Sequence, residues 1–238
     1  MDNPAYEART LQEKFVTLYR FINHNTNKRL DYDIAITYNY RDINSQSKIV
    51  SCLTLEQNGQ YDYYEEKYQS IIKGFTQFGR KIDNFIQDKS DFFFLEYILN
   101  TINENEEFNS YYFFKMMTLV EMLIKNPRHS RWLQEDYNNL VTYIPKEIGN
   151  KKDNFAKLLT QLRNAIAHAN YEKLEKKIEE YIEQFMDHYN FDYYKYSRNN
   201  WAFLNINCLL NEIIAKIIDL YLENKVLMLD RRNGKVNI

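Results

Sequence analysis

Residues 155–171, FAKLLTQLRNAIAHANY, carry the clearest helical pattern in the chain. At about 100° per residue, the apolar side chains of this stretch fall on one stripe of a helix. They are Phe155, Leu158, Leu159, Leu162, Ile166 and Ala169. Asn164 and His168, four residues apart, share the opposite face. The stretch therefore predicts one amphipathic helix that buries its apolar stripe and exposes a small polar group.

Arg163 flanks the apolar stripe of this predicted helix and does not share the face of His168. On a regular helix the two side chains differ in direction by roughly 140°, so the backbone alone does not bring them together. Ala165, Ala167 and Ala169 add little bulk beside the polar face, so a second surface can approach closely there. The alternative is a solvated face that carries an isolated histidine.

The composition of the whole chain favours helices. Its 238 residues include only 5 Gly and 3 Pro, far below average contents of about 7% and 5%. Sandwiches, barrels and doubly wound sheets need many tight turns, which use those residues. The glycine-rich phosphate loop of a Rossmann or P-loop enzyme is also missing from the sequence. We therefore predict an all-α protein.

Helical periodicity predicts further helices along the chain. They cover residues 4–23, 62–88, 91–102, 110–125, 131–144, 172–189 and 201–228. Residues 32–40 instead alternate with period two, the pattern of a half-buried strand. Residues 48–55 can pair with them, which predicts a short β-hairpin within 32–56. We expect an N-terminal helical extension over 1–105 and a C-terminal helical domain over 106–238.

The cysteines and the N-terminus indicate a cytoplasmic protein. Cys52 and Cys208 lie far apart and outside any metal-spaced motif, which argues against a disulfide framework or a zinc site. The first ten residues, MDNPAYEART, lack the layout of a signal peptide. No run approaches the roughly 18 uncharged apolar residues of a spanning helix, so no membrane segment is expected.

Charge is close to balanced over the chain but positive around the predicted helix. The net charge of −2 and the pI of about 6.1 argue against indiscriminate nucleic-acid binding. Residues 146–177 nevertheless hold eight basic side chains against four acidic ones. The basic ones are Lys146, Lys151, Lys152, Lys157, Arg163, Lys173, Lys176 and Lys177. This surplus suits a phosphate backbone, or it belongs to an ordinary exposed Lys/Glu-rich helix.

The six residues Arg163-Asn164-Ala165-Ile166-Ala167-His168 resemble the R-N-x-x-x-H form of the Arg-x4-His motif of the HEPN superfamily. Those helical proteins include many metal-independent endoribonucleases of toxin, abortive-infection and CRISPR systems. Residues 113–125, FFKMMTLVEMLIK, are similar to the apolar helix with an embedded glutamate found in many such domains. The likeness covers roughly residues 106–228. In the branch paired with nucleotidyltransferase antitoxins a tyrosine lies two residues after the histidine, whereas Tyr171 lies three after His168.

The resemblance implies an antiparallel helical bundle and a reaction in which RNA supplies its own nucleophile, the 2′-hydroxyl. His168 would act as general base or acid. Arg163 would hold the scissile phosphate and neutralise the charge that builds on its oxygens. Asn164 would orient the histidine or the phosphate. The products would be a 2′,3′-cyclic phosphate and a 5′-hydroxyl, and no metal or cofactor is expected.

Other residues are candidates for contact with RNA or for support of the site. Lys157, Tyr171 and Arg128 are the candidate substrate-binding residues. Arg128 and His129 follow Pro127 in a predicted interhelix loop and either touch RNA or lie in solvent. The aromatic stretch 191–198, FDYYKYSR, either lines the site or caps the bundle.

Glu121 either pairs with Arg163 as a buried carboxylate or lies solvated at the edge of its helix. In the HEPN superfamily two motifs usually meet across a dimer, which would set Arg163 of one chain against His168 of the other. The resemblance thus implies a homodimer, with growth arrest or anti-phage defence as the setting and an antitoxin or regulatory partner. The alternative is a non-catalytic helical module that binds nucleotide, RNA or a protein through the same face.

Overall fold

The computed structural model describes residues 14–15, 17–19, 21–23, 25, 73–74, 76–102, 109–186 and 198–236. This part of the chain is mostly helical and contains no strand, which confirms the all-α prediction at that level. The predicted hairpin within 32–56, Cys52 and residues 191–197 lie outside the described residues. The division into an extension and a domain stays a prediction.

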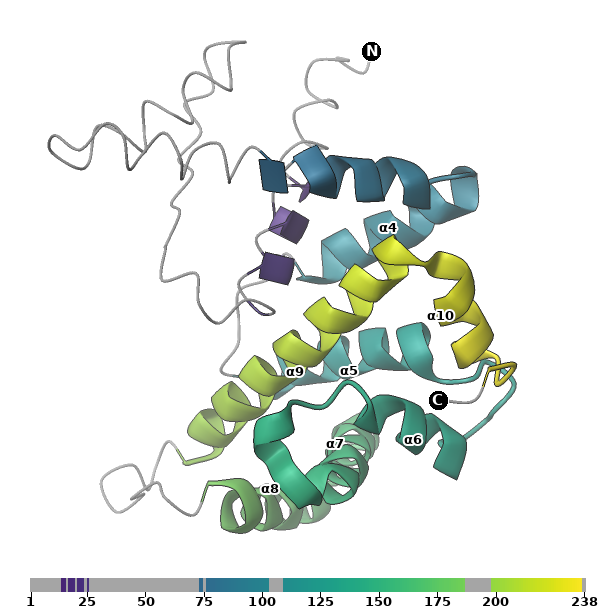
Figure 1. Cartoon of the computed structure of the whole chain (residues 1–238). Coiled ribbons are helices and arrows are strands. Elements are labelled where there is room, and N and C mark those ends of the chain that lie inside the picture. Colours follow the sequence, from purple (N-terminus) through teal and green to yellow (C-terminus); the bar gives the residue numbers. More distant parts are fainter. Residues whose placement is uncertain are drawn as a thin grey trace, which may run out of the picture.

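Seven α-helices and one 3₁₀ helix follow residues 76–85, which are also helical (Figure 1). Their bounds are α4 Lys89–Ile102, α5 Ser110–Ile124, α6 Gln134–Val141, η1 Lys146–Lys151, α7 Lys152–Ala167, α8 Tyr171–Phe185, α9 Arg198–Glu223 and α10 Lys225–Arg232. The predicted helix over 131–144 is thus shorter than expected. The prediction of a single helix over 201–228 is wrong, because the helix is interrupted at Asn224. The side chain of Asn224 accepts a hydrogen bond from Leu227 N at 3.0 Å and so caps the N-terminus of α10.

The long helix α9 forms the centre of the fold and packs against α5. Both helices are largely buried, and polar groups tie them together: Tyr112 Oη donates to Asn211 Oδ1 at 2.9 Å, and Tyr221 Oη donates to Leu123 O at 2.6 Å. Burial raises the pKa of Tyr221 to about 12, so its hydroxyl remains a donor. By length and composition α9 could span a membrane, but most of it lies buried within the bundle, as in a core helix.

Residues 81 and 91, which precede α5 in the chain, contact the C-terminal end of α9 and the start of α10. Lys81 contacts Asp219 at 2.7 Å and Glu223 at 2.8 Å. Asp91 of α4 is buried and pairs with Lys225 of α10. Burial raises the pKa of Asp91, but the bonds from Lys225 and from Gln87 N outweigh that effect and lower it. These contacts attach α4 to the α9–α10 corner.

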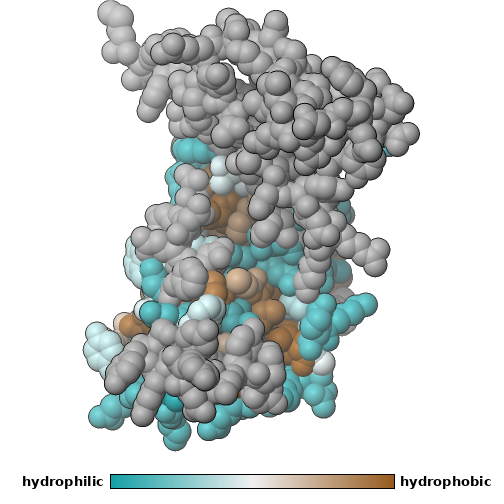
Figure 2. Space-filling model, turned by 90° about the vertical axis from the view of Figure 1, so that its left-hand side faces the viewer, coloured by the Kyte–Doolittle hydropathy of each residue, from teal (hydrophilic) through white to brown (hydrophobic). Residues whose placement is uncertain are grey.

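At the other end of the bundle, α7 packs against α5, α6 and α8. In Figure 1 α6, α7 and α8 lie below α5, and α4 lies above it. On the face drawn in Figure 2, the visible apolar areas lie among hydrophilic residues. Most of the large apolar side chains of the described residues are buried in the core. Packing against three helices therefore sets the position of α7 in the bundle.

Candidate functional site

Helix α7 ends at Ala167, four residues before the predicted end of the helix. His168 is its C-cap, and Ala169 takes a left-handed conformation with φ of 48°. Asn170 N donates to Ala165 O at 2.9 Å and Ala169 N to Ile166 O at 3.0 Å, the pair of bonds of a Schellman motif. The prediction of one continuous helix through residue 171 is therefore wrong. Ala169 does not extend the apolar stripe but is exposed.

His168 lies at the junction of α7 and α8, on the surface. Its backbone N donates to Asn164 O at 3.1 Å, and its exposed ring makes no hydrogen bond with any described residue. Asn164 and His168 were expected to share a face, but the Asn164 side chain binds Arg163, whose Nη1 donates to Asn164 Oδ1 at 3.2 Å. The ring of His168 thus remains available to a second molecule.

Arg163 is held by groups of α5 in addition to Asn164 of its own helix. Its Nη2 donates to Glu121 Oε2 of α5 at 3.0 Å, and its guanidinium lies 5.5 Å from the centre of the Phe114 ring. Glu121 Oε1 in turn accepts from Trp132 Nε1 at 2.9 Å. Of the two placements considered for Glu121, pairing with Arg163 is confirmed and the solvated position is wrong. The guanidinium is therefore fixed in position beside the end of α7.

Sequence reasoning did not single out Trp132 or Phe114. Phe114 lies seven residues before Glu121 and so on the same face of α5, a spacing that could have identified it. Trp132 comes from the loop between α5 and α6, and no local pattern connects it to Glu121. Its role depends on how that loop folds back over α5.

Arg128 and His129, which are adjacent in the loop after α5, have different surroundings in the structure. His129 Nδ1 lies 2.8 Å from Asp136 Oδ2, and its Nε2 lies 3.1 Å from Glu135 Oε1. Only 14% of the His129 side chain is exposed, so the expectation that its ring lies in solvent is wrong. Arg128 is exposed, as one of the two expectations had it, and Asn126 Oδ1 accepts from its backbone N at 3.0 Å.

The other candidate substrate-binding residues, Tyr171 and Lys157, lie on the surface, and only Tyr171 lies at the α7–α8 junction. Tyr171 is 78% exposed as the first residue of α8. Lys157 is exposed on α7 and forms no ion pair within the described ranges. The basic surplus is partly engaged, since Lys152 Nζ donates to Ile144 O and Lys177 pairs with Glu180. On the α8 side of the junction the exposed Lys173 and Lys176 are balanced by the exposed Glu172 and Glu175.

Comparison of the chain with protein-family models, with curated proteins and with solved structures finds no match. Within the described residues, no group of three or more His, Cys, Asp or Glu side chains is placed to hold a metal ion. The function must therefore be inferred from the side chains at the α7–α8 junction and from the resemblance of residues 163–168 to a known motif.

Proposed function

We propose that this protein is a HEPN-like endoribonuclease that cleaves RNA without a metal ion. One observation carries the proposal: Glu121 and Asn164 hold Arg163 in the last turns of α7, and the exposed His168 caps the same helix. A fixed cation and an available proton-transfer group are the two components that cleavage by an internal nucleophile requires. The surrounding helical fold is compatible with the resemblance.

In the proposed reaction the 2′-hydroxyl oxygen attacks the adjacent phosphorus and the bond to the 5′-oxygen breaks. His168 accepts the proton of the 2′-hydroxyl or delivers one to the departing 5′-oxygen. Arg163 retains N–H groups beyond those that bind Glu121 and Asn164, and these hold the phosphate oxygens. Lys157, Tyr171 and Arg128 are the proposed contacts for the flanking RNA.

We further propose that the active form is a homodimer in the cytoplasm. Ala167 and Ala169 are exposed beside His168, so a second copy can approach the junction closely. Such an arrangement sets Arg163 of one chain against His168 of its partner, as the resemblance implies. A toxin or anti-phage role with an antitoxin or regulatory partner follows from the resemblance alone.

The test is cleavage of total RNA by the purified full-length protein in EDTA. We expect cleavage that yields cyclic phosphate ends and that is abolished by Arg163→Ala and by His168→Ala. Lys235→Ala, which removes an exposed charge after α10 and outside the basic segment, is the matched control and should retain activity. Full cleavage by either folded site variant, or none by the wild type, rejects the proposal.

A mixing experiment tests the shared site. Equal amounts of Arg163→Ala and His168→Ala chains yield half heterodimers, each with one complete site out of two. Activity should then return to about a quarter of the wild-type level, although neither variant cuts alone. Dimers carrying two different tags confirm that exchange has occurred. Verified heterodimers without cleavage reject the shared site while leaving the ribonuclease proposal open.

A second candidate is a non-catalytic module that binds RNA, nucleotide or a protein through this surface. It is favoured by the engagement of Arg163, which pairs with Glu121 and stacks on Phe114 as a structural arginine does. RNA that binds the wild type and emerges intact from the EDTA assay would support this candidate.

A further inference from the structure

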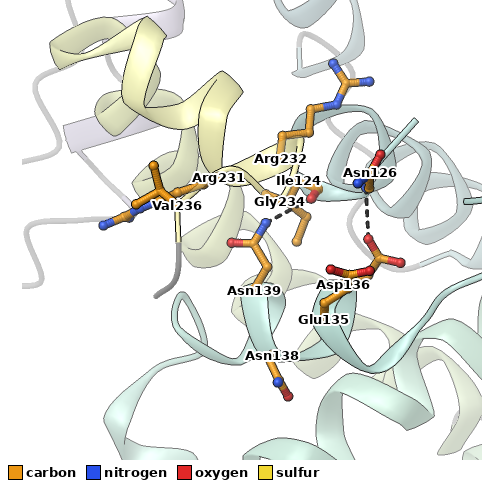
Figure 3. Close-up of a pocket in the computed structure, with 10 residues that line it drawn as sticks. All are labelled: Ile124, Asn126, Glu135, Asp136, Asn138, Asn139, Arg231, Arg232, Gly234 and Val236. Atoms are coloured by element: carbon orange, nitrogen blue, oxygen red, sulfur yellow. Dashed lines mark hydrogen bonds between the residues drawn. The ribbon is translucent and has the colours of Figure 1, made fainter. Parts of the chain in front are cut away.

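A pocket of about 300 Å³ opens where the ends of α5, α6 and α10 meet (Figure 3). None of the side chains found to line it belongs to the candidate ribonuclease site. Its lining includes Asn139 of α6 and two arginines, Arg231 and Arg232, in the last turn of α10. Its volume is at the lower end of the range for small-molecule sites, roughly 300–1,000 Å³.

Two buried polar atoms in the pocket wall have no hydrogen-bond partner within the part of the chain that the structure describes. Asn139 is 4% exposed, and its Nδ2 donates to Ile124 O at 2.9 Å, which leaves its Oδ1 without a donor. Arg231 Nε has no acceptor. In Figure 3 the Asn139 nitrogen points toward Ile124, whereas its oxygen points to the left of the view. The Arg231 side chain also extends to the left.

Such atoms are rare, because the great majority of buried polar groups are partnered. One unmatched acceptor and one unmatched donor in the same wall favour an occupant that carries both functions. The polar lining thus limits the chemistry of a ligand as well as its size.

The pocket lining holds two carboxylates and two guanidinium groups, which face different partners. Its two carboxylates, Glu135 and Asp136, both face His129, at 3.1 and 2.8 Å. Arg231 and Arg232 have no carboxylate partner within the described ranges, and Arg232 Nε donates to the backbone oxygen of Lys125 at 3.2 Å. Guanidinium groups of this kind bind carboxylate and phosphate oxygens in a bidentate manner.

We propose that this pocket binds a small organic anion that also carries a hydrogen-bond donor. A phosphate or carboxylate oxygen binds Arg231, and an N–H or O–H group of the same molecule donates to Asn139 Oδ1. The binding is separate from RNA cleavage and holds whether or not the chain is a ribonuclease.

The test is calorimetric titration of the full-length protein, with thermal shift as a second readout. Glycerol 3-phosphate and adenosine 5′-monophosphate probe the phosphate class, glutamate probes the carboxylate class, and glycerol and adenosine are the neutral controls. We expect saturable binding and a raised midpoint of thermal unfolding with at least one anionic probe and with neither neutral control. The class that binds identifies the anionic group.

Variants locate the binding. Arg231→Gln should weaken the binding at least tenfold. Val236→Trp places a large side chain in the pocket from a partly exposed position and should abolish the binding. Lys235→Gln removes a neighbouring exposed charge that pairs with Asp230 outside the lining and should change affinity less than twofold. Absence of saturable binding by every anionic probe overturns the proposal. Equal binding by wild type and Arg231→Gln, or an equal loss in Lys235→Gln, also overturns it.

Discussion

The two described histidines, His129 and His168, both lie at helix junctions and both have an arginine nearby in sequence, yet their surroundings are opposite. The ring of His129 faces a carboxylate at each nitrogen and is mostly buried. The ring of His168 is exposed and binds no described residue. A histidine whose two nitrogens are engaged supports a fold, whereas one with both nitrogens accessible can transfer protons to a substrate.

The positions of the carboxylates explain this difference. Asp136 lies in the first turn of α6 and accepts from Leu133 N and Asn126 N, both at 2.9 Å, in addition to facing His129. Glu121 of α5 performs the corresponding task for Arg163. No described carboxylate pairs with His168. The fold therefore fixes the arginine of the candidate site and leaves its histidine accessible.

The largest expected effect is on catalysis and separates the two histidines directly. His168→Ala should lower RNA cleavage by about 10² to 10⁴-fold, the range for loss of a general acid or base. Its urea unfolding curve should match that of the wild type, because the ring is exposed and forms no hydrogen bond or ion pair with a described residue. Single-turnover cleavage and urea unfolding measure the two quantities.

The companion variant, His129→Ala, should show the opposite pattern. We expect it to lower the free energy of unfolding by about 1–3 kcal/mol, since it removes the contact with the buried Asp136 and the one with the more exposed Glu135. Its folded fraction should keep most of the cleavage activity. If His129→Ala removes cleavage and His168→Ala does not, the roles assigned to the two rings are reversed.

The next largest effect is expected at Asp136, which is 2% exposed. Asp136→Ala removes the acceptor of two backbone N–H groups and of His129, so it should lower the free energy of unfolding by about 3–5 kcal/mol. The midpoint of thermal unfolding should fall by roughly 10 °C. The matched control is Glu135→Ala, whose largely exposed carboxylate should contribute less than about 1 kcal/mol. Similar losses in both variants would contradict the assigned role of Asp136.

A smaller effect is expected at the partner of Arg163. Glu121→Gln keeps an acceptor for Trp132 Nε1 but removes the charge opposite the guanidinium, which should lower the free energy of unfolding by about 1–2 kcal/mol. Glu179→Gln removes the charge opposite Arg198 in a more exposed ion pair and should change it by less than about 0.5 kcal/mol. Equal values by urea unfolding would mean that Arg163 is not anchored.

Apolar periodicity was sufficient to predict most of the described helices, because a helix that buries one face must repeat its apolar residues at that spacing. It failed at the end of α9, where Leu222 and Leu227 continue the apolar content on either side of the break. Only the Asn224 cap marks the change of direction there. Because a cap involves one side chain and one backbone N–H group, a search for apolar periodicity does not detect it.

The candidate site was predictable in part. Pairing of Glu121 with Arg163 was one of two expectations, since a carboxylate in an apolar helix requires a partner when it is buried. Asp136 and Trp132 were not predictable, because their contacts depend on the path of the loop after α5. The catalytic roles of Arg163, Asn164 and His168 stay predictions that the cleavage assays test.

The smallest expected effect is at Ala169, the residue that ends α7. A left-handed conformation costs a residue with a Cβ roughly 1–2 kcal/mol, and glycine avoids that cost but loses more entropy on folding. Ala169→Gly should therefore raise the free energy of unfolding by about 0.5–1 kcal/mol. Ala167→Gly, in the last helical position of α7, should instead lower it by about 0.5 kcal/mol.

Urea unfolding of the two glycine variants also tests the position of His168. A gain at Ala169 and a loss at Ala167 mean that the chain leaves the helix between them, so the ring lies beyond the helix end. If Ala169→Gly is destabilising to the same extent as Ala167→Gly, the helix continues through His168. The ring would then share a face with Asn164, as the spacing of the two residues predicts for an uninterrupted helix, and the contrast between the two histidines would need another explanation.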